Sequence, residues 1–340
     1  MRYLTRLKPL GPFFFGGEIT FGEAENKNYL VRSNLFPQQT TILGMLRKKL
    51  LIQEGYLKVT DKGEILDIGG KQKIESLIGP KSFDIRETEQ GFGVIKRISP
   101  VFLCKVDPSS KEMQLFNIAP KDLGMKFKKS SGRSMLNKGS KDFVPFMEGY
   151  KSKKVLVDLF IKAGTDERIK VDEIFLPAEK IGITKGKGEV QEEKAFYKQT
   201  AYRLINGFEF VCIVEIDSKP NMKGGFVFMG ADKSAFIMTV EDYEKSFEDT
   251  FSIGPDNGRI VLLSDAYVEE NIYEYCYFAM TGTVTFRNIK SSTGNYRLTK
   301  EKKKHTFLKR GSVLYPNDRS KVITKMQKPH LQKIGYNIFN

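Results

Sequence analysis

The chain has 340 residues, of which 40% are hydrophobic and 12% aromatic, so it can bury a core and is not a disordered chain. Its formal net charge of +15 favours a polyanionic partner, because each Lys or Arg placed against a phosphate releases a condensed counterion. Nucleic acid is the polyanion that this charge favours, although a basic surface also serves solubility or binding to an anionic membrane.

Cysteine usage and hydropathy exclude further classes of protein. Cys104, Cys212 and Cys276 lie far apart without a CxxC pair, which argues against a zinc ribbon and a disulfide framework and fits a reducing cytosol. The apolar run in the opening MRYLTRLKPLGPFFFGG is too short and broken for a signal peptide. No stretch approaches the roughly 20 apolar residues of a membrane span. We therefore expect a soluble, cytoplasmic protein.

The first elements in chain order are a strand and a helix. Residues 2–8 alternate in polarity and predict a strand, and a Gly/Pro/Phe loop follows. Residues 41–53 predict a helix: Pro37 prevents its extension upstream, Thr40 or Thr41 can cap it, and Gly55 ends it. Strand, loop and helix in this order are typical of the start of a ferredoxin-like βαββαβ unit.

The middle of the chain alternates short strands with polar turns. Residues 56–150 are less regular and are interpreted as insertions in the first domain. Strand patterns resume at 154–163, 195–204 and 208–217, and the polar, glycine-bearing residues 183–194 indicate the tip of a projecting hairpin. After Pro220 comes the segment GGFVFMGADKSAFIMTVE, and then we expect a short acidic helix near 240–249 and more strands near 260–290. The fold class predicted is α+β with many antiparallel strands, arranged as two ferredoxin-like units.

Charge is unevenly distributed along the chain. Residues 126–154 carry nine Lys/Arg against Asp142 and Glu148, and residues 300–340 carry eleven against Glu301 and Asp318. Residues 241–274 instead carry ten Asp/Glu against Lys245 and Arg259. Such a chain can hold RNA on one side and a protein partner on another. The alternative is that each run is a solvated face.

One face of the predicted helix suggests a phosphate contact. The apolar stripe contains Ile42, Leu46 and Leu50, and Gly44, Arg47 and Lys48 fall on the opposite face. A glycine inside a helix costs about 1 kcal/mol relative to alanine, which is easier to explain if a phosphate chain approaches the backbone there. The helix N-terminus with its hydroxyls would add an anion cradle. The alternative is a neighbouring strand packed closely against Gly44.

Two glycine-bearing segments offer backbone N–H groups, hydroxyls and cations that suit phosphate oxygens. The first, KGGFVFMGADKS, holds Gly224, Gly225 and Gly230 before Lys233 and Ser234, and the second is the Lys309–Ser312 stretch of LKRGSVLYP. Neither has the GxxxxGK[ST] spacing of a P-loop. The alternative for each is an ordinary turn.

Base stacking and catalysis have weaker signals. Aromatic residues near cations that could stack on bases are Phe13–Phe15, Phe36, Tyr197 and Tyr202, with core packing as the alternative. His305 and His330 both lie in Lys-rich contexts and are interpreted as solvated. No HxH, HExxH or paired DxD motif indicates a metal. We therefore assign no catalytic residue, no metal and no cofactor.

The motifs together resemble a known family. The segment FPQQTTILGMLRKKLL resembles the first helix of the RAMP superfamily, the RNA-binding subunits of CRISPR effector complexes. Other segments resemble one branch of this superfamily. Its opening strand and loop resemble RLKPLGPFFFGG, and its thumb resembles KIGITKGKGEVQEEKAFYKQTAYRL. Its two glycine loops resemble GGFVFMGADKS and RGSVLYP, and its closing strand resembles QKIGYNIF. That branch is the Cas-five-like Cmr-subunit-three family of type III-B systems. The resemblance is thinnest over 56–150.

The resemblance implies two ferredoxin-like (RRM-like) domains. These are 1–204, with insertions at about 56–150 and a β-hairpin thumb at about 183–194, and 205–340. It implies a non-catalytic subunit that binds and caps the 5′ repeat-derived tag of the CRISPR RNA in antiviral defence. The implied partners are the large polymerase-cyclase subunit and the backbone RAMP subunits, with target RNA met indirectly and no membrane. The implied RNA contacts are Gln38, Thr40, Thr41, Gly44, Arg47, Lys48, Lys185, Lys187, Tyr197, Gly230, Lys233, Ser234, Arg310, Gly311 and Ser312.

Three other functions stay open. The first is a metal-independent CRISPR-RNA processing endoribonuclease of the same superfamily, of the Cas-six type. The second is the equivalent subunit of a type III-A or III-D complex. The third is a general RNA-binding module unrelated to CRISPR, which would have no preference for a tag sequence.

Overall fold

The computed structural model describes fourteen stretches of the chain. They are residues 1–16, 30–59, 65–67, 69–107 with 109–110 and 112–123, 125–127, 145–147, 158–183, 196–217 with 219–230 and 232–245, 258–291, and 298–340. The core clusters draw on residues from both ends and from the middle of the chain, so segments far apart in sequence pack together.

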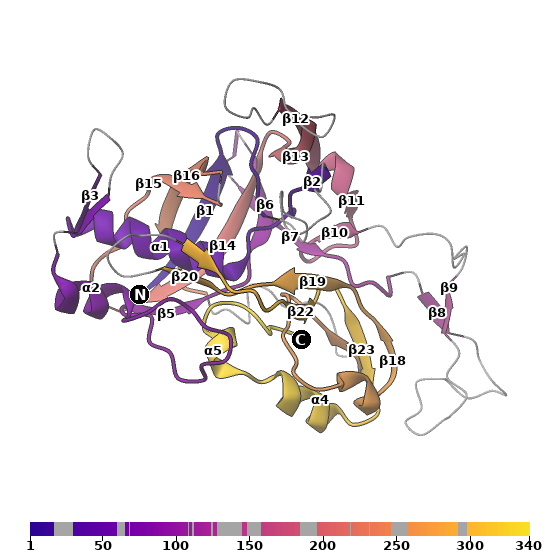
Figure 1. Cartoon of the computed structure of the whole chain (residues 1–340). Helices are drawn as coiled ribbons and strands as arrows, with labels where there is room; N and C mark the ends of the chain where they lie inside the picture. The colour runs from indigo at the N-terminus through magenta and orange to yellow at the C-terminus, as the bar shows by residue number, and fades with distance from the viewer. Residues whose placement is uncertain are drawn as a thin grey trace.

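A large antiparallel sheet forms the body of the described chain (Figure 1). Within it, β1 (Arg2–Pro9) lies between β14 (Phe208–Ile216) and β16 (Ser234–Asp242). Leu7 pairs with Phe210 on one side and with Met238 on the other, and all three are buried. The sheet order is β11 (Arg168–Lys170), β10 (Leu159–Lys162), β7 (Met113–Ile118), β6 (Phe102–Val106), β14, β1, β16 and β15 (Gly225–Met229), with β5 (Ile95–Ile98) also paired to β14.

Helix α1 (Gln39–Gln53) covers one face of this sheet beside β15 and β16 (Figure 1). Its apolar stripe Ile42, Leu46 and Leu50 is buried in the same cluster as Val227 of β15 and Met238 of β16. Helix α2 (Lys71–Ile78) packs against α1 on the other side. Amphipathic burial therefore fixes which face of α1 is turned to solvent.

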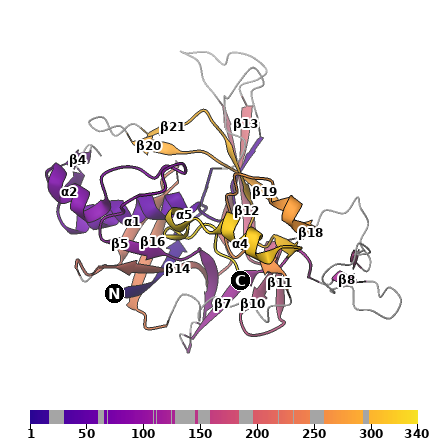
Figure 2. The ribbon, with the colours of Figure 1, turned by 90° about the horizontal axis from the view of Figure 1, so that it is seen from below.

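A second, three-stranded sheet stands away from the large one (Figure 2). Strand β12 (Phe175–Ile183) pairs antiparallel with β13 (Phe196–Leu204), and β13 pairs parallel with β2 (Leu30–Arg32). The predicted hairpin is confirmed in its two strands, while its tip at 184–195 lies outside the described residues.

The C-terminal part of the chain adds small sheets and short helices below the large sheet in Figure 1. Two of its aromatics, Phe307 and Tyr336, belong to the same core cluster as Leu7, so this part shares the main core. Its elements are β17 (Ile260–Val261), η2 (Ile272–Tyr275), β18 (Cys276–Met280), β19 (Thr283–Phe286), β20 (Ile289–Ser291), β21 (Leu298–Lys300), β22 (His305–Leu308), β23 (Val313–Pro316), α4 (Arg319–Met326) and α5 (Pro329–Gln332). Elsewhere lie β3 (Leu57–Val59), β4 (Ile65–Asp67), β8 (Met125–Phe127), β9 (Pro145–Met147) and η1 (Val171–Glu173).

Most local predictions are confirmed, and two are wrong. The strands at 2–8, 195–204 and 208–217 appear as β1, β13 and β14, and Gly55 follows α1 with a positive φ of 71°. Thr40 and Thr41 do not cap α1, because the helix begins at Gln39 and its N-cap is Gln38. Residues 240–242 are not helical, because β16 continues there in pairing with β1.

The fold is a mixed, strand-rich α/β structure. Residues 95–118, inside the segment interpreted as an insertion, supply β5, β6 and β7 to the large sheet. Strand β1 pairs with β14 and β16, which follow residue 204. The division into two domains stays a prediction.

Candidate nucleic-acid interface

The start of α1 is enclosed by the C-terminal end of the chain. Gln39 is 1% exposed, and its Nε2 donates to the carbonyl oxygens of Ser99 at 2.8 Å and Ile334 at 2.7 Å. Tyr336 is buried beside Thr40 at the same helix end, and this burial raises the pKa of its hydroxyl. Gln38 donates to the carbonyl oxygen of Thr285 at 3.4 Å. The chain's own groups therefore occupy much of the predicted anion cradle.

The outer face of α1 is open at Gly44. This glycine is exposed, and a Cβ added to it would meet no atom of the described residues within 4 Å. The alternative that a neighbouring strand packs closely against Gly44 is therefore wrong. Lys48, one turn further along, is half-exposed. The helix backbone at Gly44 is thus accessible to a ligand next to a cation.

Arg47 does not share this open face. Its Nη1 donates to the carbonyl oxygen of Lys81 at 3.0 Å, and its guanidinium carbon lies 5.5 Å from the centre of the Phe92 ring. Among the described residues its Nε and Nη2 have no hydrogen-bond acceptor, although both are buried. Burial lowers the pKa of Arg47 to about 10, so the side chain remains cationic at neutral pH. The loop of residues 79–93 covers it.

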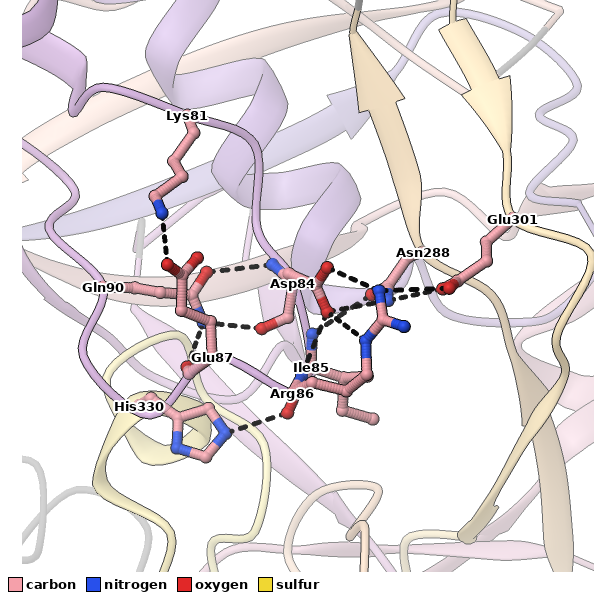
Figure 3. A network of polar contacts seen from close by, with 9 residues as sticks. All are labelled: Lys81, Asp84, Ile85, Arg86, Glu87, Gln90, Asn288, Glu301 and His330. Carbon is pink, nitrogen blue, oxygen red and sulfur yellow. Dashed lines mark hydrogen bonds and ion pairs between the residues drawn. The ribbon is translucent and has the colours of Figure 1, made fainter.

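A polar network joins this loop to two C-terminal segments (Figure 3). Asn288 accepts from the backbone N–H of Ile85 at 3.2 Å and donates to Asp84 at 3.1 Å and to Glu301 at 2.7 Å. A ring nitrogen of His330 lies 3.2 Å from the carbonyl oxygen of Ile85. Because Asn288 is fully buried, its polar partners are needed to offset its desolvation.

The first glycine segment lies beside α1 and against the loop after β1. Lys49 of α1 donates to the carbonyl oxygen of Gly224 at 2.7 Å. Gly230 has φ +76°, and an added Cβ would lie 2.6 Å from the carbonyl oxygen of Phe14. The Ser234 hydroxyl accepts from the Phe14 N–H at 3.1 Å. Lys233 is exposed in the turn between β15 and β16. Of the three RNA contacts predicted in this segment, Lys233 is exposed, whereas Gly230 and Ser234 are half-buried.

The second glycine segment is built into the interior. Arg310 is 5% exposed, its Nη1 donates to the carbonyl oxygen of Val101 at 2.6 Å, and its guanidinium carbon lies 4.3 Å from the centre of the Phe36 ring. Gly311 is buried with φ +78°. The buried Ser312 hydroxyl donates to the Lys309 carbonyl oxygen at 2.5 Å. These groups hold the chain's own backbone together.

Both segments therefore meet the stretch that leads into α1, but they do not form one continuous open face. The first contacts Phe14, and the second stacks its Arg310 guanidinium on Phe36. Sequence reasoning missed a cation pair next to the second segment, where Lys121 and Lys309 both contact Asp158, at 3.2 and 2.6 Å. The two lysines lower the pKa of Asp158 against the effect of its burial.

The predicted thumb residues are only partly described. Lys185 and Lys187 lie outside the described residues, and Tyr197 pairs with Gly182 through the backbone, while its side chain is not described. On the described part of the hairpin, Ile181 is 74% exposed.

The candidate stacking residues of the first loop belong to the core. Phe13, Phe14 and Phe15 are all buried, and the half-buried rings of Phe36 and Tyr202 pack against Phe175. The core-packing alternative is the right one for them.

The interpretation of both histidines as solvated is wrong. His305 and His330 are buried, and burial lowers the pKa of each. Within the described part of the chain, no three His, Cys, Asp or Glu side chains gather to hold a metal ion. Over the same residues, no helix has the length and apolarity needed to cross a bilayer.

Comparison with known proteins identifies the family. The family model described as CRISPR-associated protein (Cas_Cmr3) matches residues 5–339. No curated protein matches the chain. Two similar solved chains come from cryo-EM structures of the Type III-B Cmr-beta bound to cognate target RNA, in one of them also to AMPPnP. Each has a TM-score of 0.49 and 16% identity, covering 100% of this chain and 96% of the other. Because the family model spans nearly the whole sequence, the chain belongs to the Cas_Cmr3 family of CRISPR-associated proteins.

Proposed function

We propose that this chain is a non-catalytic, cytoplasmic RNA-binding subunit of a type III-B CRISPR effector complex. In this proposal it binds and caps the 5′ repeat-derived tag of the CRISPR RNA and contacts the large polymerase-cyclase subunit and the backbone RAMP subunits. Its two parts are ferredoxin-like domains, and β12–β13 is the thumb at the end of the tag. Family membership and the net charge of +15 support this role.

The open backbone at Gly44 is the observation that carries the proposal. A helix-interior glycine costs stability, and no atom of the described chain requires it at this position. A phosphate of the tag that lies over Gly44, with Lys48 beside it, would explain why a glycine occupies this helix position. Lys233, in the turn between β15 and β16, is a further exposed cation of the predicted contact set. Arg47, Arg310 and Ser312 then support this surface from inside, because their polar groups face the protein.

The buried histidines favour a binding role over the endoribonuclease alternative. A general acid or base must reach the proton it transfers, and His305 and His330 are 4% and 5% exposed. Incubating the purified chain with repeat RNA in a chelator tests this choice. We expect intact RNA, and cleavage that is lost in His305→Ala or His330→Ala would contradict the proposal.

The direct test is to purify the chain with the complex from its host and to sequence the RNA that accompanies it. We expect a fixed 5′ tag joined to many different guide sequences. RNA without a common 5′ end would favour a general RNA-binding module. The subunits that co-purify distinguish a type III-B complex from type III-A or III-D.

A further inference from the structure

The most exposed aromatic side chains of the large sheet lie on the face opposite α1. In β15, Val227 and Met229 point toward α1 and are buried, so Phe226 and Phe228 point the other way. Phe226 is 70% exposed and Phe228 is 53% exposed. Burying such side chains is favourable, so two phenylalanines in water on one strand mark a binding surface.

The neighbouring strands extend these two residues into a platform. Phe226 pairs with Ile237 of β16, which pairs with Lys8 of β1, and all three side chains are exposed on one face. The next row runs from Phe228 through Ala235 to the segment of Leu10, whose N–H donates to the Ala235 carbonyl oxygen at 3.0 Å. We call Phe226, Phe228, Ile237 and Leu10 the β15 platform.

Three exposed lysines lie next to the platform strands. Lys223 precedes β15, Lys233 lies in the turn after it, and Lys8 lies across the sheet, and all are exposed. Among the described residues, none of these three has a carboxylate within ion-pair distance. Of the nearby acids, Glu241 pairs with Arg6 at 2.5 Å. Asp232 accepts from the neutral Gln199 amide at 2.7 Å and keeps its charge, so the three lysines and Arg6 outnumber the acids. The surface therefore combines aromatic rings with net positive charge.

We propose that the β15 platform stacks the bases of single-stranded RNA, with Phe226 and Phe228 each holding one base and the three lysines holding phosphates. Residues i and i+2 of a strand stand about 7 Å apart, which matches two bases splayed over neighbouring rings. A purely apolar protein contact would not require the three lysines, whereas strand-face aromatics flanked by cations suit a polyanion with stacked bases. The inference rests on the proposed RNA-binding role and extends it from α1 to the other face of the β15–β16 hairpin.

The absence of tryptophan in this sequence allows a direct optical test. Phe228→Trp gives the chain a single tryptophan, and a base stacked on the indole quenches its fluorescence. The probe is a 12-nucleotide oligoadenylate RNA, titrated at moderate salt, with binding followed in parallel by the anisotropy of a label on the RNA. Tyr273→Trp is the control, because Tyr273 is 44% exposed in η2, which leads directly into β18, far from β15 in Figure 1.

We expect RNA to quench the indole of the Phe228→Trp variant and to leave that of the Tyr273→Trp variant unchanged, at RNA concentrations that also raise the anisotropy. The variant Phe226→Ala/Phe228→Ala should bind the RNA about tenfold or more weakly. Phe226→Leu/Phe228→Leu keeps an apolar surface without aromatic rings and should lose nearly as much. Thermal melts of both double variants check that the fold survives.

Each other outcome has a definite meaning. RNA binding by anisotropy without quenching in the Phe228→Trp variant overturns the platform and leaves the proposed function standing. No RNA binding by the wild-type chain overturns both. The platform is a protein-docking surface instead if both double variants keep full RNA affinity and the complex purified with Phe226→Ala/Phe228→Ala, but not with Phe226→Leu/Phe228→Leu, lacks a protein subunit.

Discussion

The side-chain amide of Gln39 and the backbone of Gly335 share one small space, which ties the first residue of α1 to the last turns of the chain. An added Cβ at residue 335 would collide with Gln39 Nε2 and would lie 2.6 Å from the Ser99 carbonyl oxygen. Gly335 also has φ +88°, a conformation that other residues rarely adopt. The position of α1 therefore depends on a glycine far from it in sequence.

Replacing Gly335 should destabilise the protein severely. In Gly335→Ala the methyl group meets rigid backbone and the buried Gln39 amide, so we expect a loss of at least about 3 kcal/mol in the free energy of unfolding. Gly164→Ala is the matched control: the φ of Gly164 is +77°, but an added Cβ would meet no atom within 4 Å in the part of the chain that the structure describes. It should lose only about 1 kcal/mol. Urea denaturation measures the free energy of unfolding of both variants. Equal losses would show that Gly335→Ala is destabilising only because of backbone strain at a positive φ.

Gly44 should respond in the opposite direction. Because a Cβ there meets open space, Gly44→Ala should raise the free energy of unfolding by up to about 1 kcal/mol. The same methyl group stands where we propose that a phosphate approaches, so RNA affinity should fall, and it should fall further in Gly44→Leu. Chemical denaturation and RNA anisotropy on the same samples separate the two effects. Unchanged RNA affinity in the leucine variant would remove Gly44 from the interface.

Lys48 and Arg47 are neighbours in sequence with different expected roles. Lys48→Ala should weaken RNA binding and reduce the slope of log affinity against log salt by about 0.7, since one phosphate contact is lost. Arg47→Ala should mainly lower the melting temperature, because its guanidinium packs on Phe92 and the Lys81 carbonyl under the 79–93 loop. Lys321→Ala, at an exposed position in α4, is the control for general charge. A larger reduction of the salt slope in Arg47→Ala than in Lys48→Ala would reverse this assignment.

Local sequence signals predicted much of the fold, since β1, α1, β13 and β14 each show the apolar spacing of their own element. Long-range packing decided what the signals could not. The Lys-rich sequence around Arg310 and His305 predicts surface positions, yet both residues are buried. Arg310 contacts Val101 and His305 contacts Tyr267, which are distant in sequence. No signal in the sequence indicated that Phe226 and Phe228, in an apolar run, lie on the outer face of β15 and are exposed.

The two buried histidines make stability depend on pH in a defined window. Burial lowers both pKa values below 6.5, so below that pH the unfolded chain binds more protons than the folded one. Stability should therefore fall as pH drops below about 6.5, by up to about 1.4 kcal/mol per pH unit for each histidine. Asp158, with its lowered pKa, titrates only at lower pH. Urea melts at pH 7.5, 6.5 and 5.5 measure the slope, which should flatten in His305→Phe/His330→Gln. If the free energy of unfolding of the double variant falls equally steeply with decreasing pH, other groups cause the pH dependence.

Asn288 should be the most sensitive point of the network that holds the 79–93 loop (Figure 3). Asn288→Ala leaves the Ile85 N–H and the carboxylates of Asp84 and Glu301 without this partner in a buried setting, so we expect a loss of about 3 kcal/mol. Asn317→Ala is the control, because this exposed asparagine makes one 3.4 Å bond to a carbonyl oxygen and should lose less than about 0.5 kcal/mol. Hydrogen exchange locates the effect: amides of residues 81–93 should exchange faster in Asn288→Ala, while those of β1 and β14 keep their protection relative to global unfolding. If all regions lose protection equally, the network stabilises the whole core and the loop has no separate opening of its own.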